Sequence, residues 1–174
     1  MAKWAIDPDH SVAAFAVRHM MIASVRGLFN KITGTIYFDP ADIKNSSVEA
    51  AIDVASIWTG IQKRDDHLRS PDFFDAGKYP QIIFRSTRVE SAGGKGLKII
   101  GDLTIRGITH PVTMEVEYSG PVKSPFNGTS LGFAGTTRIN RQDYGVSWNE
   151  PMEGGFVVGD DVQITLDIEA DLTD

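Results

Sequence analysis

Apolar and polar side chains alternate one by one along much of the chain. In residues 112–118, VTMEVEY, every second position is apolar and the positions between are polar or acidic. A period of two is typical of a β-strand that buries one face and exposes the other to water. Segments of this kind recur about eight times, which predicts eight strands. They span residues 13–17, 32–38, 48–54, 82–89, 97–105, 112–118, 131–139 and 162–168.

Short polar or glycine-containing stretches join most of these segments, as in residues 107–111 (GITHP). Short connections favour antiparallel neighbours, and no segment with a helical period is long enough for a crossover. Open sheets leave unpaired edges, which closure into a barrel removes. The sequence therefore predicts one all-β domain over residues 1–174, an eight-stranded antiparallel up-and-down barrel.

The segment between the third and fourth predicted strands departs from the period of two. Thr59 and Gln62 have the spacing of a capping box, which predicts a short helix over about residues 61–69. Two adjacent aromatic residues, Phe73 and Phe74, follow the helix. We interpret this helical insertion as a lid over an apolar interior.

The interior of an eight-stranded barrel is either filled by side chains or holds one small ligand. Small residues at inward positions leave space, although glycines also mark bends and bulges that let a sheet curl. Together with the lid and the aromatic loop of residues 144–156, these small residues favour a cavity. They are Ala13, Gly34, Ala50, Gly101 and Gly135.

Composition excludes several classes of function. The chain has 17 Lys and Arg against 23 Asp and Glu, a net charge of −6, which argues against nucleic acid and anionic membranes as partners. With no cysteine, disulfides, thiolate nucleophiles and cysteine-based zinc sites are excluded. The first residues contain no apolar signal segment, so we expect a cytoplasmic protein without stable membrane insertion, or a periplasmic one if a native signal has been removed.

Catalytic and metal-binding motifs give no positive signal. The four histidines lie in or beside predicted loops, without metal-ligand spacing, so we expect no metal. No nucleophile elbow, phosphate loop or dinucleotide fingerprint is present, so we expect no enzyme and no catalytic residues. One alternative is a proton-transfer pair of His67 and Asp65, although a solvated helix face explains these residues equally well.

Spaced motifs along nearly the whole chain resemble the bacterial YceI-like family, whose members are described as polyisoprenoid-binding and lipocalin-like. The resemblance implies a lipid-filled barrel, a helical insertion after the third strand and often a homodimer. It implies isoprenoids, quinones or fatty-acid amides as ligands, and no catalytic residues. Many members carry an export signal for the periplasm, and the first residues of this sequence depart from that pattern. The motifs include Asp7-Pro-Asp-His10-Ser11, Arg64-Asp-Asp-His67-Leu68, Ser70-Pro-Asp-Phe-Phe74, Gly101-Asp-Leu-Thr-Ile-Arg-Gly107 and Asn140-Arg141 before Tyr144-Gly145.

We therefore expect a protein that binds, stores or transports a long-chain amphiphilic lipid, with no other cofactor. An enzyme acting on such a lipid and a lipid- or stress-sensing interaction module remain the alternatives. The register of the fourth strand is open, so either Ile82 or Ile83 faces inward. The expected lumen residues are Phe15, Val17, Ile36, Phe38, Ile52, Val54, Phe84, Leu103 and Phe133, closed by Phe73 and Phe74, with His19, Arg64 and His67 as polar groups near the opening.

Overall fold

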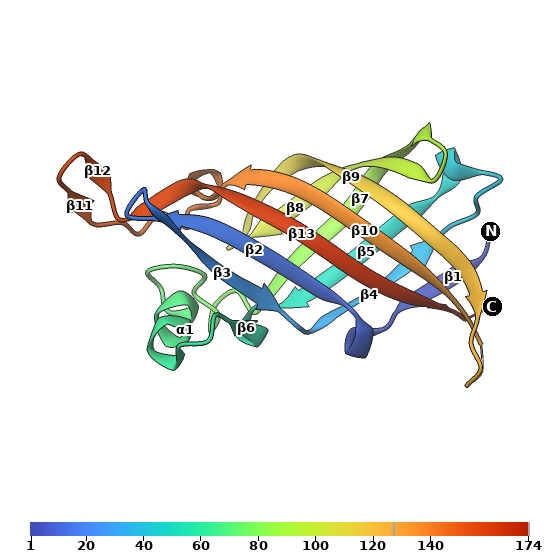
Figure 1. Ribbon diagram of the computed structural model, residues 1–174, viewed down its shortest axis with the longest axis horizontal. Coiled ribbons are helices and arrows are strands. Elements are labelled where there is room, and N and C mark those ends of the chain that lie inside the picture. The colour runs from blue at the N-terminus through green and yellow to red at the C-terminus, as the bar shows by residue number, and fades with distance from the viewer. Residues whose placement is uncertain (127, 174) are drawn as a thin grey trace.

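The computed structural model describes residues 1–126 and 128–173 (Figure 1). Its strands are β1 (Lys3–Ile6), β2 (Val12–His19), β3 (Ala23–Phe29), β4 (Ile32–Tyr37), β5 (Ser47–Asp53), β6 (Ile57–Trp58), β7 (Gln81–Gly93), β8 (Gly96–Ile105), β9 (Ile108–Lys123), β10 (Thr129–Asn140), β11 (Pro151–Met152), β12 (Gly155–Phe156) and β13 (Val158–Leu172). The helices are α1 (Gln62–Arg69) and the 3₁₀ turns η1 (Pro8–His10), η2 (Ile43–Asn45), η3 (Val54–Ser56) and η4 (Arg141–Tyr144).

The sheet closes on itself as an antiparallel barrel. The strands run in the order β1-β4-β5-β7-β8-β9-β10-β13, and β13 returns to β1 through the pair Trp4–Leu172. β13 also pairs with β2, so β1 and β2 are two halves of one strand interrupted by η1. In the same way β3 and β4 together form the second strand, pairing with β2 and β1 respectively. The predicted eight-stranded up-and-down barrel is confirmed.

The alternation of apolar and polar residues did not predict β1 or β3, each of which is half of a barrel strand. β1 is four residues long and is followed by Pro8 in η1, which fixes φ and lacks a backbone donor. β3, with the sequence ASVRGLF, has small residues at two of the four positions of its apolar face and a leucine on its polar face, which weakens the alternation. Neither segment alternates long enough to predict a strand, although both complete the wall.

The helix between the third and fourth strands is confirmed, but the predicted capping box is wrong. Ile61 occupies the N-cap position without a side-chain hydrogen bond, and Gln62 is the first helical residue, too early to reach back. Instead the backbone N–H of Thr59 donates to Asp65 Oδ1 at 2.9 Å, and the Thr59 hydroxyl donates to the same oxygen. The buried Asp65 thus anchors the start of α1. No helix in the described part of the chain has the length and apolar character that crossing a bilayer requires.

The inward faces of β10 and β13 become more buried from one end of the barrel to the other. Near α1 the inward residues Ile139 and Ile164 are only partly buried, whereas Leu131 is 1% exposed and Ala170 is 0% exposed at the far end. We call the far end, where β1 begins and β13 ends, the packed end. The opposite end, beside α1 and residues 141–158, is the mouth (Figure 1).

Aromatic side chains fill the packed end. The Phe38 ring is buried, with its centroid 4.9 Å from that of Tyr118 and 5.5 Å from that of Phe133. Trp4 lies beside it and donates its indole N–H to the Phe38 carbonyl at 3.2 Å. Edge-to-face aromatic contacts of this kind add to the stability that burial supplies. These buried rings therefore close-pack the interior at this end of the barrel.

Candidate ligand-binding cavity

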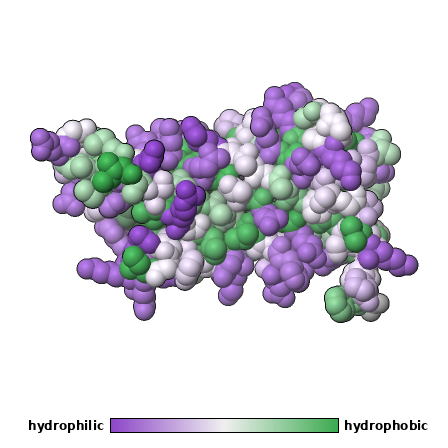
Figure 2. Space-filling view, in the orientation of Figure 1, coloured by the Kyte–Doolittle hydropathy of each residue, from purple (hydrophilic) through white to green (hydrophobic). Residues whose placement is uncertain are grey.

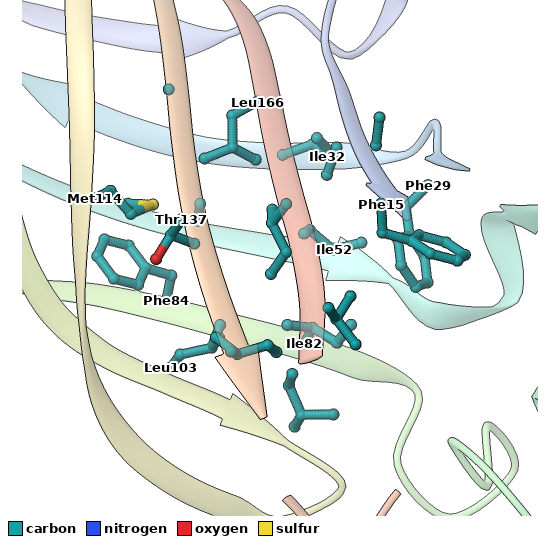
Figure 3. Close-up of a pocket in the computed structure, with 18 of the residues that line it drawn as sticks. Phe15, Phe29, Ile32, Ile52, Ile82, Phe84, Leu103, Met114, Thr137 and Leu166 are labelled. Atoms are coloured by element: carbon teal, nitrogen blue, oxygen red, sulfur yellow. The ribbon is translucent and has the colours of Figure 1, made fainter. Parts of the chain in front are cut away.

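A cavity of about 440 Å³ lies inside the barrel, between the packed end and the mouth. Side chains from many strands project into it, among them Phe15, Phe84, Leu103 and Leu166 (Figure 3). Its lining is almost wholly apolar. Small-molecule sites usually occupy about 300–1,000 Å³, so this space has the size of a ligand site.

Thirteen of the fourteen residues predicted as ligand-binding line this cavity, whereas their contact with a ligand stays a prediction. The exception is Val54, because β5 ends at Asp53 and the chain turns into η3, where alternation no longer sets the direction of a side chain. Val54 packs in the core instead, outside the cavity lining. The thirteen are Phe15, Val17, His19, Ile36, Phe38, Ile52, Arg64, His67, Phe73, Phe74, Phe84, Leu103 and Phe133.

The small inward residues divide into two groups. Ala13, Ala50 and Gly135 line the cavity, as expected. Gly101 does not, because a Cβ there would lie 2.5 Å from Cζ of the Phe84 ring, which covers this position. Gly34 is likewise covered by its neighbours. These two glycines allow close packing of the wall, and the space arises elsewhere.

The register of β7 places Ile82 inward, in the cavity lining, and Ile83 outward, in a shallow groove on the outer wall. The prediction also omitted residues that line the cavity. Val162, Ile164 and Leu166 on β13 had the required alternation and could have been included. Trp148, which comes from the loop after η4, had no periodic signal.

Two of the three predicted polar groups near the mouth, Arg64 and His67, are already bonded to the protein. Arg64 donates through Nε to the Thr59 hydroxyl at 2.7 Å and through a terminal nitrogen to the Thr59 carbonyl at 2.8 Å. His67 Nε2 lies 2.8 Å from Asp72 Oδ2. The alternative pair of His67 with Asp65 is therefore not formed, since Asp65 is bonded to Thr59 instead.

His67 also takes part in an aromatic cluster that covers the cavity. Its ring centroid lies 5.0 Å from that of Phe73 and 4.9 Å from that of Trp148, both edge to face. Phe73 and Trp148 are themselves 5.4 Å apart. The cluster joins the segment after α1 to the loop after η4, and its members line the cavity. The helical insertion thus covers the interior as the sequence indicated.

Arg141 is a buried cation that organises the other side of the mouth. Its side chain is 5% exposed and donates to four backbone carbonyls, those of Gly159, Val146, Trp148 and Val158, at 2.7–3.1 Å. Burial lowers its pKa, and the Asp160 carboxylate at 3.9 Å opposes that shift. Arginine nevertheless keeps its charge in proteins. One side chain therefore holds both ends of the segment of residues 146–159, which carries Trp148.

Tyr144 is the buried neighbour of this arginine in η4. Its hydroxyl has no hydrogen-bond partner among the described residues. Burial, assisted by the nearby Asp143 carboxylate, raises the pKa of Tyr144 to about 12, so the phenol is neutral at physiological pH. A buried polar group without a partner costs about 1–3 kcal/mol.

We expect Tyr144→Phe to leave the free energy of unfolding unchanged or to raise it by about 1 kcal/mol, because only an unpartnered hydroxyl is removed. Urea denaturation measures the change. Ser46→Ala is a parallel test, since the Ser46 hydroxyl is also buried and unpartnered among the described residues. A clear loss of stability in Tyr144→Phe would show that the hydroxyl has a partner.

Among residues 1–126 and 128–173, one group of side chains is close enough together to hold a metal ion. It consists of Asp7, His10 and Glu169, whose ligand atoms lie within 4.8 Å of one another. The hydrogen bond between His10 Nδ1 and Asp7 Oδ2, 2.7 Å long, raises the pKa of His10 and lowers that of Asp7. This bond accounts for the proximity of Asp7 and His10 without an ion, and none of the three residues lines the cavity.

A closed antiparallel barrel with an apolar cavity under a helical lid is typical of the small-ligand-binding β-barrels. The chain belongs to the YceI-like family, because the model of the YceI-like domain matches residues 4–170. A UPF0312 protein of Vibrio parahaemolyticus is 39% identical over 137 residues, which cover 79% of this chain and 72% of that protein.

Solved structures agree with this fold. BcnA of Burkholderia cenocepacia superposes with a TM-score of 0.83 at 30% identity, covering 94% of this chain and 98% of BcnA. A polyisoprenoid-binding domain from Saccharophagus degradans, implicated in plant cell wall breakdown, has a TM-score of 0.71 at 16% identity, covering 99% of this chain and 100% of that domain. At 16% identity the likeness shows the fold alone.

Proposed function

We propose that this protein binds a long-chain amphiphilic lipid, such as a polyisoprenoid, an isoprenoid quinone or a fatty-acid amide, and stores or transports it. The observation that carries this proposal is the cavity of about 440 Å³ with its almost wholly apolar lining. A hydrocarbon tail fits such a lining, because it leaves no polar group unsatisfied. The name of the Saccharophagus degradans domain, which describes that protein as polyisoprenoid-binding, is consistent with a ligand of this class.

The energetics favour a tail over a polar ligand. Each buried methylene contributes about 0.8 kcal/mol, so ten of them contribute about 8 kcal/mol, the scale of a micromolar dissociation constant before ordering costs are subtracted. The head group would lie at the mouth, where His19 is partly exposed beside the cavity. Affinity would then come chiefly from the tail, which explains why the sequence contains no local binding motif.

Organic extraction of the purified protein followed by mass spectrometry tests the proposal directly. In a second experiment, a ubiquinone with two isoprene units is added from ethanol while tryptophan emission is recorded. Trp148 lines the cavity, so a bound quinone should quench its emission, and Trp148→Phe should abolish most of the change. Protein that yields no lipid on extraction and shows no saturable quenching would contradict the proposal.

We expect Ala50→Phe to weaken quinone binding about tenfold or more, because the added ring occupies space that the tail needs. Ala50 lines the cavity, whereas its neighbour Ala51 faces the outer groove, so Ala51→Phe is the matched control. Circular dichroism establishes that both variants fold. Equal affinities for the two folded variants would place the quinone outside the barrel.

A further inference from the structure

The turn between β2 and β3 exposes three consecutive large apolar residues. Met20 is 40% exposed, Met21 is 52% exposed and Ile22 is 81% exposed. The turn is closed by a hydrogen bond from the Ile22 N–H to the His19 carbonyl at 3.2 Å. Met20 and Met21 have φ of +52° and +62°, the left-handed conformation at both central positions of a tight turn.

This conformation is unfavourable for methionine. Hairpin turns with positive φ at both central positions strongly prefer Asn-Gly or Asp-Gly, which adopt it at little cost. Long side chains seldom adopt it, and residues held in it cluster at functional sites. The pair Met20-Met21 therefore works against the stability of the turn while placing two apolar side chains in water. Folding alone does not explain this choice.

A second loop adds to the same surface. A Cβ built on Gly155, in the β11–β12 hairpin, would lie 2.9 Å from Met21 Sδ, so the hairpin packs against the turn. Phe156 on this hairpin is 58% exposed. We call Met20, Met21, Ile22 and Phe156 the apolar rim. Figure 2 shows hydrophobic surface at the end of the molecule where these two loops lie.

The apolar rim is continuous with the cavity. His19, directly before the turn, and Val157, directly after Phe156, both line the cavity. The Met20 N–H donates to the Val157 carbonyl at 2.8 Å, which ties the two sides together. A hydrocarbon chain could thus pass from the rim to the interior along apolar side chains.

We propose that the apolar rim docks into the surface of an uncharged lipid bilayer, where the amphiphile enters and leaves the cavity; this inference rests on the proposed function. A water-insoluble guest has to be exchanged with a membrane, and shallow insertion needs only a few apolar side chains. The net charge of −6, with Glu150 just before the hairpin and Glu153 in its turn, disfavours an anionic surface. Four side chains on two loop tips are too few for a stable dimer interface, which buries about 800 Å² on each partner.

Flotation with phosphatidylcholine vesicles tests the docking. The wild-type protein should float with the vesicles, and Met20→Asn combined with Met21→Gly should reduce the bound fraction about tenfold. The same double variant should unfold at an equal or higher temperature, because Asn-Gly suits the turn. The control is Val122→Ser combined with Phe126→Ser, which removes residues 63% and 90% exposed near the packed end and should float like the wild type.

Wild-type protein that stays unbound, or a double variant that floats equally well, would overturn the docking. So would a double variant that changes from dimer to monomer in light scattering while its vesicle binding is unchanged, because the rim would then join two copies. Delivery of the quinone distinguishes the two proposals. Quenching by quinone added in ethanol but not by quinone in vesicles would refute docking, whereas no quenching from either source would refute the proposed ligand.

Discussion

Replacing Arg141 by leucine is expected to lower the free energy of unfolding by about 3–5 kcal/mol, the cost typical of breaking a buried charged network. Four backbone carbonyls accept hydrogen bonds from this one guanidinium, and the substitution removes these donors. The Val158 carbonyl keeps a second hydrogen bond, from the Asn149 side-chain amide at 2.7 Å. Two of the four carbonyls, on Val146 and Trp148, belong to the segment that covers the mouth. Its release should also weaken quinone binding.

Urea denaturation measures the stability of Arg141→Leu, and tryptophan emission reports the release of Trp148. Arg138→Leu is the matched control, because Arg138 is exposed and its bond to Gln163 Oε1 is 3.3 Å long. That variant should change stability by less than about 0.5 kcal/mol. The stability of Arg141→Lys should lie between those of these two variants, since one ammonium group cannot reproduce the planar arrangement of guanidinium donors. If Arg141→Leu were as stable as Arg138→Leu, the four carbonyl contacts would contribute little.

A single methyl group at Gly34 is expected to destabilise the barrel by about 3 kcal/mol. A Cβ at this position would clash with the Glu49 carbonyl oxygen and lie 2.9 Å from the Ala50 Cα, both backbone atoms of the paired strand. Backbone cannot rotate away as a side chain can, so β4 and β5 would have to separate. The effect is steric, because the φ of Gly34 lies outside the left-handed region.

Gly77→Ala is the control for Gly34→Ala, because a Cβ at Gly77 would meet no atom within 4 Å. Its stability should stay within about 0.5 kcal/mol of the wild type. Thermal and urea unfolding of both variants provide the comparison. A Gly34→Ala protein as stable as Gly77→Ala would mean that the two strands yield easily at this point.

The sequence predicted those parts of the fold in which one rule acts alone. β8, β9, β10 and β13 bury one face and expose the other. Alternation therefore identified these strands and showed which of their residues face inward. The same alternation correctly predicted that Phe84, Leu103 and Phe133 face the cavity. It failed at Val54, where a 3₁₀ turn replaces the strand. It also failed for β1 and β3, which are parts of strands with a break in the middle.

The mouth could not be predicted in this way. Because it is charged, arginine normally lies at the surface. Arg141 is buried because the fold of residues 146–159 brings backbone carbonyls within hydrogen-bond distance of it. The family resemblance marked this arginine without assigning it a role. Trp148 and the partner of His67 depend on the same tertiary contacts. Asp72 lies five residues from His67, a spacing that no helical rule singles out.

The aromatic packing around Phe38 obstructs the barrel at the packed end, so the barrel resembles a sleeve with a floor of aromatic rings. Under the proposed function, a guest chain that entered past Trp148 would meet this floor and would leave through the mouth, so the unit that entered last would leave first. The sleeve also has a fixed depth. A chain longer than the sleeve would keep its surplus units outside the wall, where they gain no contact with it. Affinity should therefore rise with chain length until the chain fills the sleeve and should change little beyond that length.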